Sequence, residues 1–257
     1  MEIIRYPARN AWQELLKRPV LDNHAVDALV LPVLEDVKNQ GDTSLFEYTR
    51  KFDKVSLSSL RVTGEEFAEA DGLVDDELKK AIETAIHNIK VFHEMQQIRP
   101  ERIETTKGVV CWQKAVAIQK VGLYIPGGSA PLFSTVLMLA IPAQIAGCSE
   151  IVLCTPPDRN GKINPAVLYA AAVTGVTLVF KIGGAQAIAA MAYGTATVPK
   201  VNKIFGPGNQ YVMAAKQLVS RGEVAIDMPA GPSELAVIAD DSANPVFVAV
   251  PAISLAS

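Results

Sequence analysis

From Val121 onward the sequence repeats one pattern: a short apolar run, a turn rich in Gly and Pro, and then an apolar helical segment. Short strands that alternate with helices are typical of parallel sheets, whose strands are connected by right-handed helical crossovers. The pattern therefore predicts an α/β fold for this part of the chain. The predicted strands cover residues 121–125, 151–154, 176–182, 203–205 and, after the turn Ala230-Gly231-Pro232, 235–239, and the predicted helices cover 132–146, 165–174, 185–193 and 209–220.

The first 120 residues have a different composition. They contain 17 of the 24 Lys and Arg residues and 20 of the 27 Asp and Glu residues, whereas 13 of the 17 Gly residues follow them. Apolar residues at helical spacing predict solvated helices over 22–41 and 75–97, although Pro32 predicts a kink or break in the first. Thr106-Lys107-Gly108 predicts a hairpin turn. The fold class expected for the whole chain is α/β, with a helical N-terminal region ahead of a parallel sheet with flanking helices.

The overall charge argues against polyanionic partners. The formal net charge is −3 and the chain has no run of Lys or Arg, so we expect no binding to nucleic acid or to a membrane surface. Residues 121–149 contain no charged side chain, but Pro126, Pro131 and Pro142 interrupt them. This segment therefore predicts a buried strand, turn and helix rather than a membrane span.

Cysteine and histidine usage indicates the compartment and limits the metal chemistry. The three cysteines are odd in number and form no C-x-x-C motif, which is typical of a reducing cytoplasm. Residues 1–10 lack the apolar core of a secretory signal. We therefore expect a cytoplasmic protein. The three histidines all lie between residues 24 and 93, which argues against a zinc site built from this chain alone.

Three glycine turns follow predicted strands, at residues 127–128, 183–184 and 206–208. The turns after parallel strands line one edge of a sheet, where helix N-termini face a bound ligand. Polar side chains beside these turns are candidate ligand contacts, namely Tyr124, Gln186, Asn209 and, beside the later turn at 230–232, Ser233. The alternative interpretations are a strand Tyr, an exposed helix Gln, an N-cap Asn and a turn Ser, with glycines that serve tight turns only.

Several common chemistries lack their residues. None of the glycine turns completes the dinucleotide fingerprint G-x-G-x-x-G, because Tyr211 stands where the third glycine would be. No histidine lies near the later turns, which disfavours a Ser-His-Asp hydrolase. Cys148 and Cys154 fall in a predicted helix end and strand, which disfavours an aldehyde dehydrogenase with a cysteine thioester.

Five motifs, in order along the chain, closely resemble the histidinol dehydrogenase family. They are Val121-Gly122-Leu123-Tyr124-Ile125-Pro126-Gly127-Gly128, Ser134-Thr135-Val136-Leu137-Met138, Gly183-Gly184-Ala185-Gln186-Ala187-Ile188-Ala189-Ala190, Phe205-Gly206-Pro207-Gly208-Asn209 and Ile226-Asp227-Met228-Pro229-Ala230-Gly231-Pro232-Ser233-Glu234. The resemblance implies oxidation of L-histidinol to L-histidine through histidinal, in histidine biosynthesis, with two NAD⁺ reduced in succession. It also implies a zinc ion that holds the substrate, an incomplete Rossmann-like domain for NAD and an intertwined homodimer.

Carried over by motif, the resemblance implies roles for four residues already noted at the turns. Tyr124, Gln186 and Asn209 match the family's NAD-contacting positions, and Ser233 matches its substrate-contacting serine. It further implies three parts: residues 1–120 as a helical region with short strands that belongs to a first α/β domain, 121–233 as the Rossmann-like NAD-binding domain, and 234–257 as a return into the first domain.

The resemblance ends at about Ala249. There the family continues with a segment whose Gln and His bind zinc, and with Leu255 this chain has no donor atom at the Gln position. The family's catalytic Glu-His pair and its remaining zinc ligands have no counterpart in these 257 residues. We therefore expect an N-terminal portion of such an enzyme, with no catalytic or metal-binding residues of its own and no turnover alone. The alternative is a non-catalytic nucleotide-binding or dimerisation module.

Overall fold

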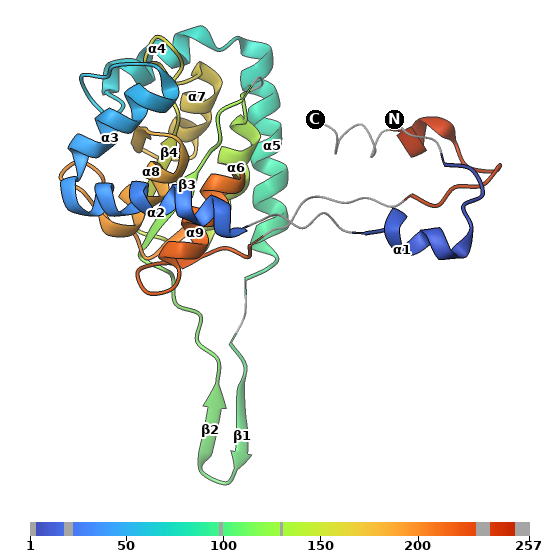
Figure 1. Cartoon of the computed structure of the whole chain (residues 1–257). Coiled ribbons are helices and arrows are strands. Elements are labelled where there is room, and N and C mark those ends of the chain that lie inside the picture. The colour runs from blue at the N-terminus through green and yellow to red at the C-terminus, as the bar shows by residue number, and fades with distance from the viewer. Residues whose placement is uncertain (1–3, 18–22, 98–99, 129–130, 230–236, 250–257) are drawn as a thin grey trace.

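The computed structural model describes residues 4–17, 23–97, 100–128, 131–229 and 237–249 (Figure 1). Its centre is a sheet of five strands, each parallel to its neighbours, in the order β5-β4-β3-β6-β7. This arrangement confirms the predicted α/β fold with a parallel sheet. The strands are β3 (Lys120–Tyr124), β4 (Glu150–Thr155), β5 (Leu178–Lys181), β6 (Lys203–Phe205) and β7 (Ala225–Ile226).

The helices between the strands cover both faces of the sheet. Their apolar side chains form two core clusters, one on each face, which is why the strands are almost continuously apolar. The helices α6 (Phe133–Ile145) and α7 (Pro165–Val173) pack on one face, and α8 (Gly184–Tyr193) and α9 (Gln210–Val219) pack on the other. The chain therefore builds β3, β4 and β5 outward in one direction, crosses back through α8, and builds β6 and β7 outward in the other. The strand order reverses between β3 and β6.

The helices of the N-terminal region pack onto the outside of these layers. The helix α2 (Asn23–Gln40) contacts α8 and α9, whereas α4 (Gly64–Leu73) contacts α7 and α5 (Asp76–Glu94) contacts α6. Between them lie α3 (Asp42–Tyr48) and η2 (Thr49–Asp53), a single turn of π-helix. The two predicted helices are confirmed as α2 and α5.

The break expected at Pro32 is wrong, because α2 continues through this residue. Proline removes the hydrogen bond to the carbonyl of Ala28, but both residues are exposed, so water can solvate the freed carbonyl. The short helix α4 was not predicted. It begins with a capping box in which Thr63 and Glu66 each bond the backbone amide of the other.

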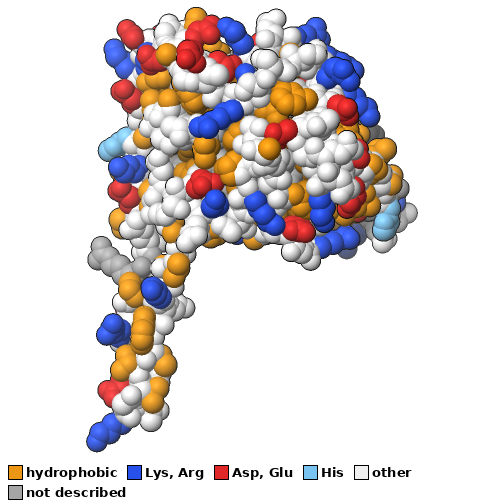
Figure 2. All heavy atoms as spheres, turned by 90° about the vertical axis from the view of Figure 1, so that its left-hand side faces the viewer, with side chains coloured by type: hydrophobic (Ala, Val, Ile, Leu, Met, Phe, Trp, Pro, Cys, Tyr) orange, Lys and Arg blue, Asp and Glu red, His pale blue; other side chains and the backbone are white. Residues whose placement is uncertain are grey.

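A two-stranded arm projects from the body of the molecule (Figures 1 and 2). Its strands β1 (Arg102–Thr106) and β2 (Val109–Trp112) pair antiparallel, which confirms the hairpin predicted at Thr106-Lys107-Gly108. All residues of both strands are exposed. Their exposed large apolar side chains are Ile103, Val109, Val110 and Trp112.

The ends of the described chain lie outside the α/β body (Figure 1). They contain η1 (Arg9–Ala11), α1 (Trp12–Leu15) and a helical turn over residues 245–249. The strand predicted over 235–239 is wrong for residues 237–239, the part of it that the structure describes. These residues are not in a strand, and Ile238 is fully exposed. Apolar side chains favour a strand only where a neighbouring strand can pair with it. None of the helices in the described residues has the length and apolar character that a bilayer crossing needs.

Candidate ligand site at the strand reversal

The order of the strands reverses between β3 and β6, so the connections that leave the carboxyl ends of these two strands diverge. In open α/β sheets, diverging connections at such a point leave room for a ligand. Two of the predicted turns flank this point, because Tyr124 ends β3 and Gly206 follows β6. A third predicted turn, at Gly183-Gly184, follows β5 on the same edge and begins α8.

Tyr124 connects two of these turns. Its side chain is 3% exposed, and its hydroxyl oxygen accepts a hydrogen bond of 3.0 Å from the backbone N–H of Gly184. Burial, with a smaller contribution from the charge of Asp53, raises the pKa of Tyr124 to about 12. The hydroxyl therefore stays protonated at neutral pH and keeps its own hydrogen for donation to a ligand.

Gln186 lies in the first turn of α8 and is 1% exposed, so the interpretation of an exposed helix Gln is wrong. Its side chain folds back over the start of the helix. A Cβ atom placed on Gly184 would lie only 2.8 Å from Gln186 Oε1. This oxygen is buried and accepts no hydrogen bond within the described part of the chain. A buried acceptor without a donor is costly in a folded protein, and it marks a place where a ligand donor would be favourable.

Asn209 caps the N-terminus of α9. Its Oδ1 accepts hydrogen bonds of 3.1 Å from the backbone amides of Tyr211 and Val212. The N-cap interpretation is therefore confirmed. The residue is also exposed, so the cap does not exclude contact with a ligand.

The glycines of these turns allow close packing of protein against protein. A Cβ built on either Gly127 or Gly183 would lie 2.6 Å from the side chain of Pro156, and one on Gly206 would lie 2.1 Å from the carbonyl oxygen of Tyr124. Gly206 also has φ +131°, a conformation that favours glycine. The glycines bring the turns after four strands together at one edge, and the space that their side chains would fill is occupied by Pro156 and the carbonyl of Tyr124.

Two charged residues that the sequence did not single out hold the turn after β6. Lys216 of α9 is 2% exposed, and its Nζ donates a 2.9 Å hydrogen bond to the carbonyl of Gly206 and pairs with Asp227 Oδ1. Asp227 Oδ2 accepts a 2.9 Å hydrogen bond from the N–H of Gly206. No sequence signal distinguished Lys216 from a solvated helix Lys, because its partners lie 10 and 11 residues away.

Asp53 was also not identified from the sequence as a candidate site residue. It ends the π-helical turn η2, directly before Lys54, a non-glycine residue with φ +59°. Burial raises the pKa of its carboxyl to about 6, and its Oδ2 is buried with no hydrogen-bond donor among the described residues. Its charge also contributes to the raised pKa of the Tyr124 hydroxyl. π-Helical turns occur often at functional sites.

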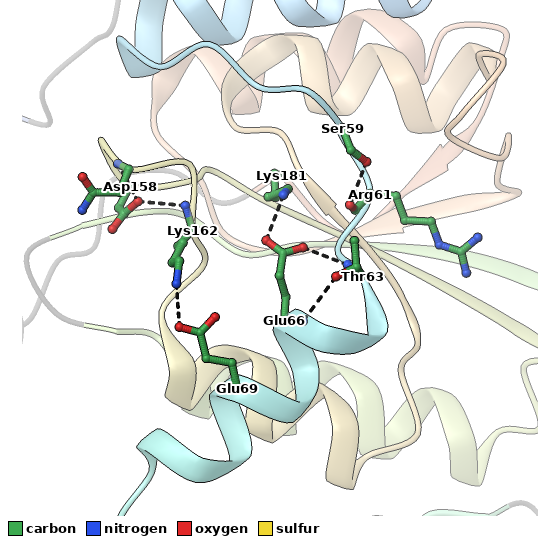
Figure 3. Close-up of polar contacts among 9 residues, drawn as sticks. Ser59, Arg61, Thr63, Glu66, Glu69, Asp158, Lys162 and Lys181 are labelled. Atoms are coloured by element: carbon green, nitrogen blue, oxygen red, sulfur yellow. Dashed lines mark hydrogen bonds and ion pairs between the residues drawn. The ribbon is translucent and has the colours of Figure 1, made fainter.

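A network of charges fixes α4 beside the end of β5 (Figure 3). Lys181, the last residue of β5, is largely buried and donates a 2.9 Å hydrogen bond to Glu66. Lys162 pairs with Glu69, one turn further along α4. The network therefore ties the turn that leads into Gly183-Gly184 to the N-terminal region.

Metal and thiol chemistry finds little support in the described residues. They contain no cluster of three or more His, Cys, Asp or Glu side chains that could hold a metal ion. Burial raises the pKa values of the Cys148 and Cys154 thiols, which makes them poor nucleophiles. Ser233 and Leu255, the predicted substrate contact and the residue at the family's zinc position, lie outside the described residues.

The strand order, with helices on both faces of a parallel sheet, defines a doubly wound α/β class of domain. Residues 16–256 match the family model of histidinol dehydrogenase, and the chain belongs to this family. It is 62% identical over 256 residues to histidinol dehydrogenase from Bacteroides thetaiotaomicron, covering 100% of this chain and 60% of that protein. It is 53% identical over 238 residues to the enzyme from Salmonella typhimurium, covering 91% of this chain and 54% of that protein.

A solved structure agrees with this assignment. The crystal structure of histidinol dehydrogenase from Elizabethkingia anophelis matches with a TM-score of 0.92 and 55% sequence identity, over 97% of this chain and 58% of that chain. The 257 residues thus span about 60% of the length of the relatives they match.

Proposed function

We propose that this chain supplies the NAD⁺-binding part of a histidinol dehydrogenase, which oxidises L-histidinol to L-histidine through histidinal and reduces two NAD⁺. Family membership supports the reaction. The observation that carries the cofactor assignment is the buried Oε1 of Gln186, which accepts no hydrogen bond from the described residues. Gln186 folds over Gly184, whose backbone N–H donates to the Tyr124 hydroxyl. Residues 121–233 are proposed as the cofactor domain, 1–120 as part of a first domain and 234–257 as the return to it.

Tyr124, Gln186 and Asn209 would hold the cofactor. NAD⁺, when bound, accepts the hydride that leaves the substrate carbon. The Tyr124 hydroxyl can donate to an acceptor on the ligand, and Gln186 Oε1 can accept from an amide or hydroxyl group. Both groups are buried, so a ligand reaches them only when the turns around them open.

Substrate and metal contacts are proposed on family membership alone. Ser233 would contact L-histidinol. Zinc belongs to the proposed whole enzyme, but the described residues do not fit it, since they gather no three donor groups. We therefore assign no step to zinc here, and we propose that the 257 residues alone do not turn over L-histidinol.

Calorimetric titration of the 257-residue chain with NAD⁺ tests the cofactor site. We expect saturable binding that Gln186→Leu weakens about tenfold, because the buried amide loses its hydrogen bond to the ligand. Gln113→Leu, on the exposed arm, is the matched control and should bind as the parent chain does. Absence of NAD⁺ binding by the parent chain, or equal affinity in the Gln186→Leu variant, would contradict the assignment.

We also propose a homodimer. An isolated two-stranded hairpin is marginally stable in water, so the exposed apolar arm of β1 and β2 needs a surface to pack on. This arm supports a second candidate as well, a non-catalytic module that binds a nucleotide or dimerises. Restored dehydrogenase activity on addition of the remaining part of a relative would favour the enzyme, whereas NAD⁺ binding without restored activity would favour the module.

The proposed location is the cytoplasm. All three cysteines, Cys111, Cys148 and Cys154, are free thiols, as expected in a reducing compartment.

A further inference from the structure

The turn after β6 is held by an ion pair inside the protein. Lys216 is 2% exposed and the side chain of Asp227 is 29% exposed, so both charges are largely withdrawn from water. Together they bond both sides of Gly206: Lys216 Nζ donates to its carbonyl oxygen, and Asp227 Oδ2 accepts from its N–H. Each of these hydrogen bonds is 2.9 Å long.

Such a pair is a poor source of stability. The desolvation of the two charges offsets most of their attraction, and replacing both partners by apolar residues of similar volume often leaves stability unchanged. What the pair does supply is a fixed geometry, because charged hydrogen bonds to a backbone carbonyl and amide hold one peptide conformation. Gly206 packs against the carbonyl of Tyr124, so the pair also sets how closely the β6 turn approaches the end of β3.

The clamped turn joins two of the proposed cofactor contacts. Asn209 follows it by one residue and begins α9, the same helix that carries Lys216. Tyr124 stands across the strand reversal from it. Loss of the clamp would leave Asn209 capping its helix but would free the turn to shift relative to Tyr124.

We propose that Lys216 is a positioning residue for the cofactor: with Asp227 it fixes the Gly206-Pro207-Gly208 turn so that Tyr124 and Asn209 face the same ligand. This inference rests on the proposed NAD⁺ binding and deepens it. The ammonium group of Lys216 is already bonded to the Gly206 carbonyl and to Asp227, so its effect on binding passes through the turn.

The test compares Lys216→Met with Lys200→Met in the 257-residue chain. Lys200 also forms an ion pair, with Glu223 at 3.1 Å, but on the surface with half of its side chain exposed. Three quantities are measured: the NAD⁺ dissociation constant, the thermal midpoint, and the hydrogen exchange of the amides in residues 204–210. We expect Lys216→Met to weaken NAD⁺ binding about tenfold or more, to speed exchange in this turn and to lower the midpoint, because Asp227 is left without its partner. Lys200→Met should change none of the three.

The outcomes separate the two proposals. If the parent chain binds no NAD⁺, the proposed function fails; if the parent binds and Lys216→Met binds equally well, only the positioning role fails. Unchanged exchange in the turn of Lys216→Met overturns the positioning role whatever the cofactor result. If Lys216→Met does not fold, the double variant Lys216→Met/Asp227→Asn takes its place. It leaves no unpaired charge and keeps an acceptor for the Gly206 N–H, and the same NAD⁺ binding and exchange results then test the positioning role.

Discussion

The hydroxyl of Tyr124 and the backbone amide of Gly184, 60 residues apart in sequence, meet in a 3.0 Å hydrogen bond. Tyr124 ends the central strand β3 and Gly184 begins α8 after the outer strand β5, so the bond spans the carboxyl edge of the sheet. It satisfies an amide at a helix N-terminus, where backbone donors have no partner within the helix. The bond thus fixes the start of α8, where Gln186 lies.

Tyr124→Phe should cost about 1 kcal/mol of unfolding free energy, since the ring stays buried while the Gly184 amide loses its acceptor. It should also weaken NAD⁺ binding. Denaturant titration and calorimetry measure the two effects. The control is Tyr193→Phe, which removes a hydroxyl from a half-buried tyrosine at the end of α8 and should leave NAD⁺ affinity unchanged. Equal effects of the two substitutions would show that the Tyr124 hydroxyl has no special role.

Asp53→Asn should stabilise the chain in a pH-dependent way. Burial raises the pKa of Asp53 from 3.8 to about 6, so the folded state binds this proton more tightly than the unfolded state. The protonated carboxyl therefore contributes to the free energy of unfolding in full below about pH 4, and this contribution is lost as pH rises through about 6. Asp53→Asn carries no such charge, and its thermal midpoint should exceed the parent's by more at pH 7.5 than at pH 4.

Asp241→Asn, at an exposed position, is the control and should show no such difference. A parent and an Asp53→Asn variant with parallel stability curves from pH 4 to 7.5 would rule out this effect of burial.

Glu66→Ala should destabilise the chain by about 2–4 kcal/mol, because it removes the partner of a largely buried Lys181 and half of the Thr63 capping box. Glu69→Ala removes a carboxylate from the same helix that pairs with Lys162, but both of these side chains are about half exposed. Surface pairs contribute little, so this variant should lose less than about 1 kcal/mol. Urea denaturation of both variants measures the contrast, and similar losses would refute it.

Trp112→Ser and Ile103→Ser on the arm should shift the chain toward monomer without lowering its thermal midpoint. Both side chains are more than half exposed in one copy, so the folded body does not depend on them. Burial of such side chains between two copies would be favourable by roughly 1.5–3 kcal/mol each. Sedimentation velocity at several concentrations measures the shift, with Lys107→Ser at the turn of the arm as control. An unchanged monomer fraction would remove the arm from the dimer proposal.

Much of the fold follows from local patterns. The alternating strands and helices between residues 120 and 219, the long helix α5 with its Asp75 cap and the β1-β2 hairpin all depend on spacing and turn chemistry within a few residues. The strand order and the short elements α3, η2, α4 and β7 were not predicted. These elements have few residues, and contacts with distant parts of the chain decide them.

The candidate site divides in the same way. The sequence by itself determined which polar residues follow the strands, because parallel strands bring their following turns to one edge. Only the tertiary structure decided that Gln186 is buried with no hydrogen-bond donor among the described residues, that Pro156 fills the space above two glycines, and that Lys216 holds the turn after β6. It also decided that Asp53 is buried. The physical reason is that burial and charge pairing depend on atoms far apart in the chain, and one sequence records the residues but not their distances.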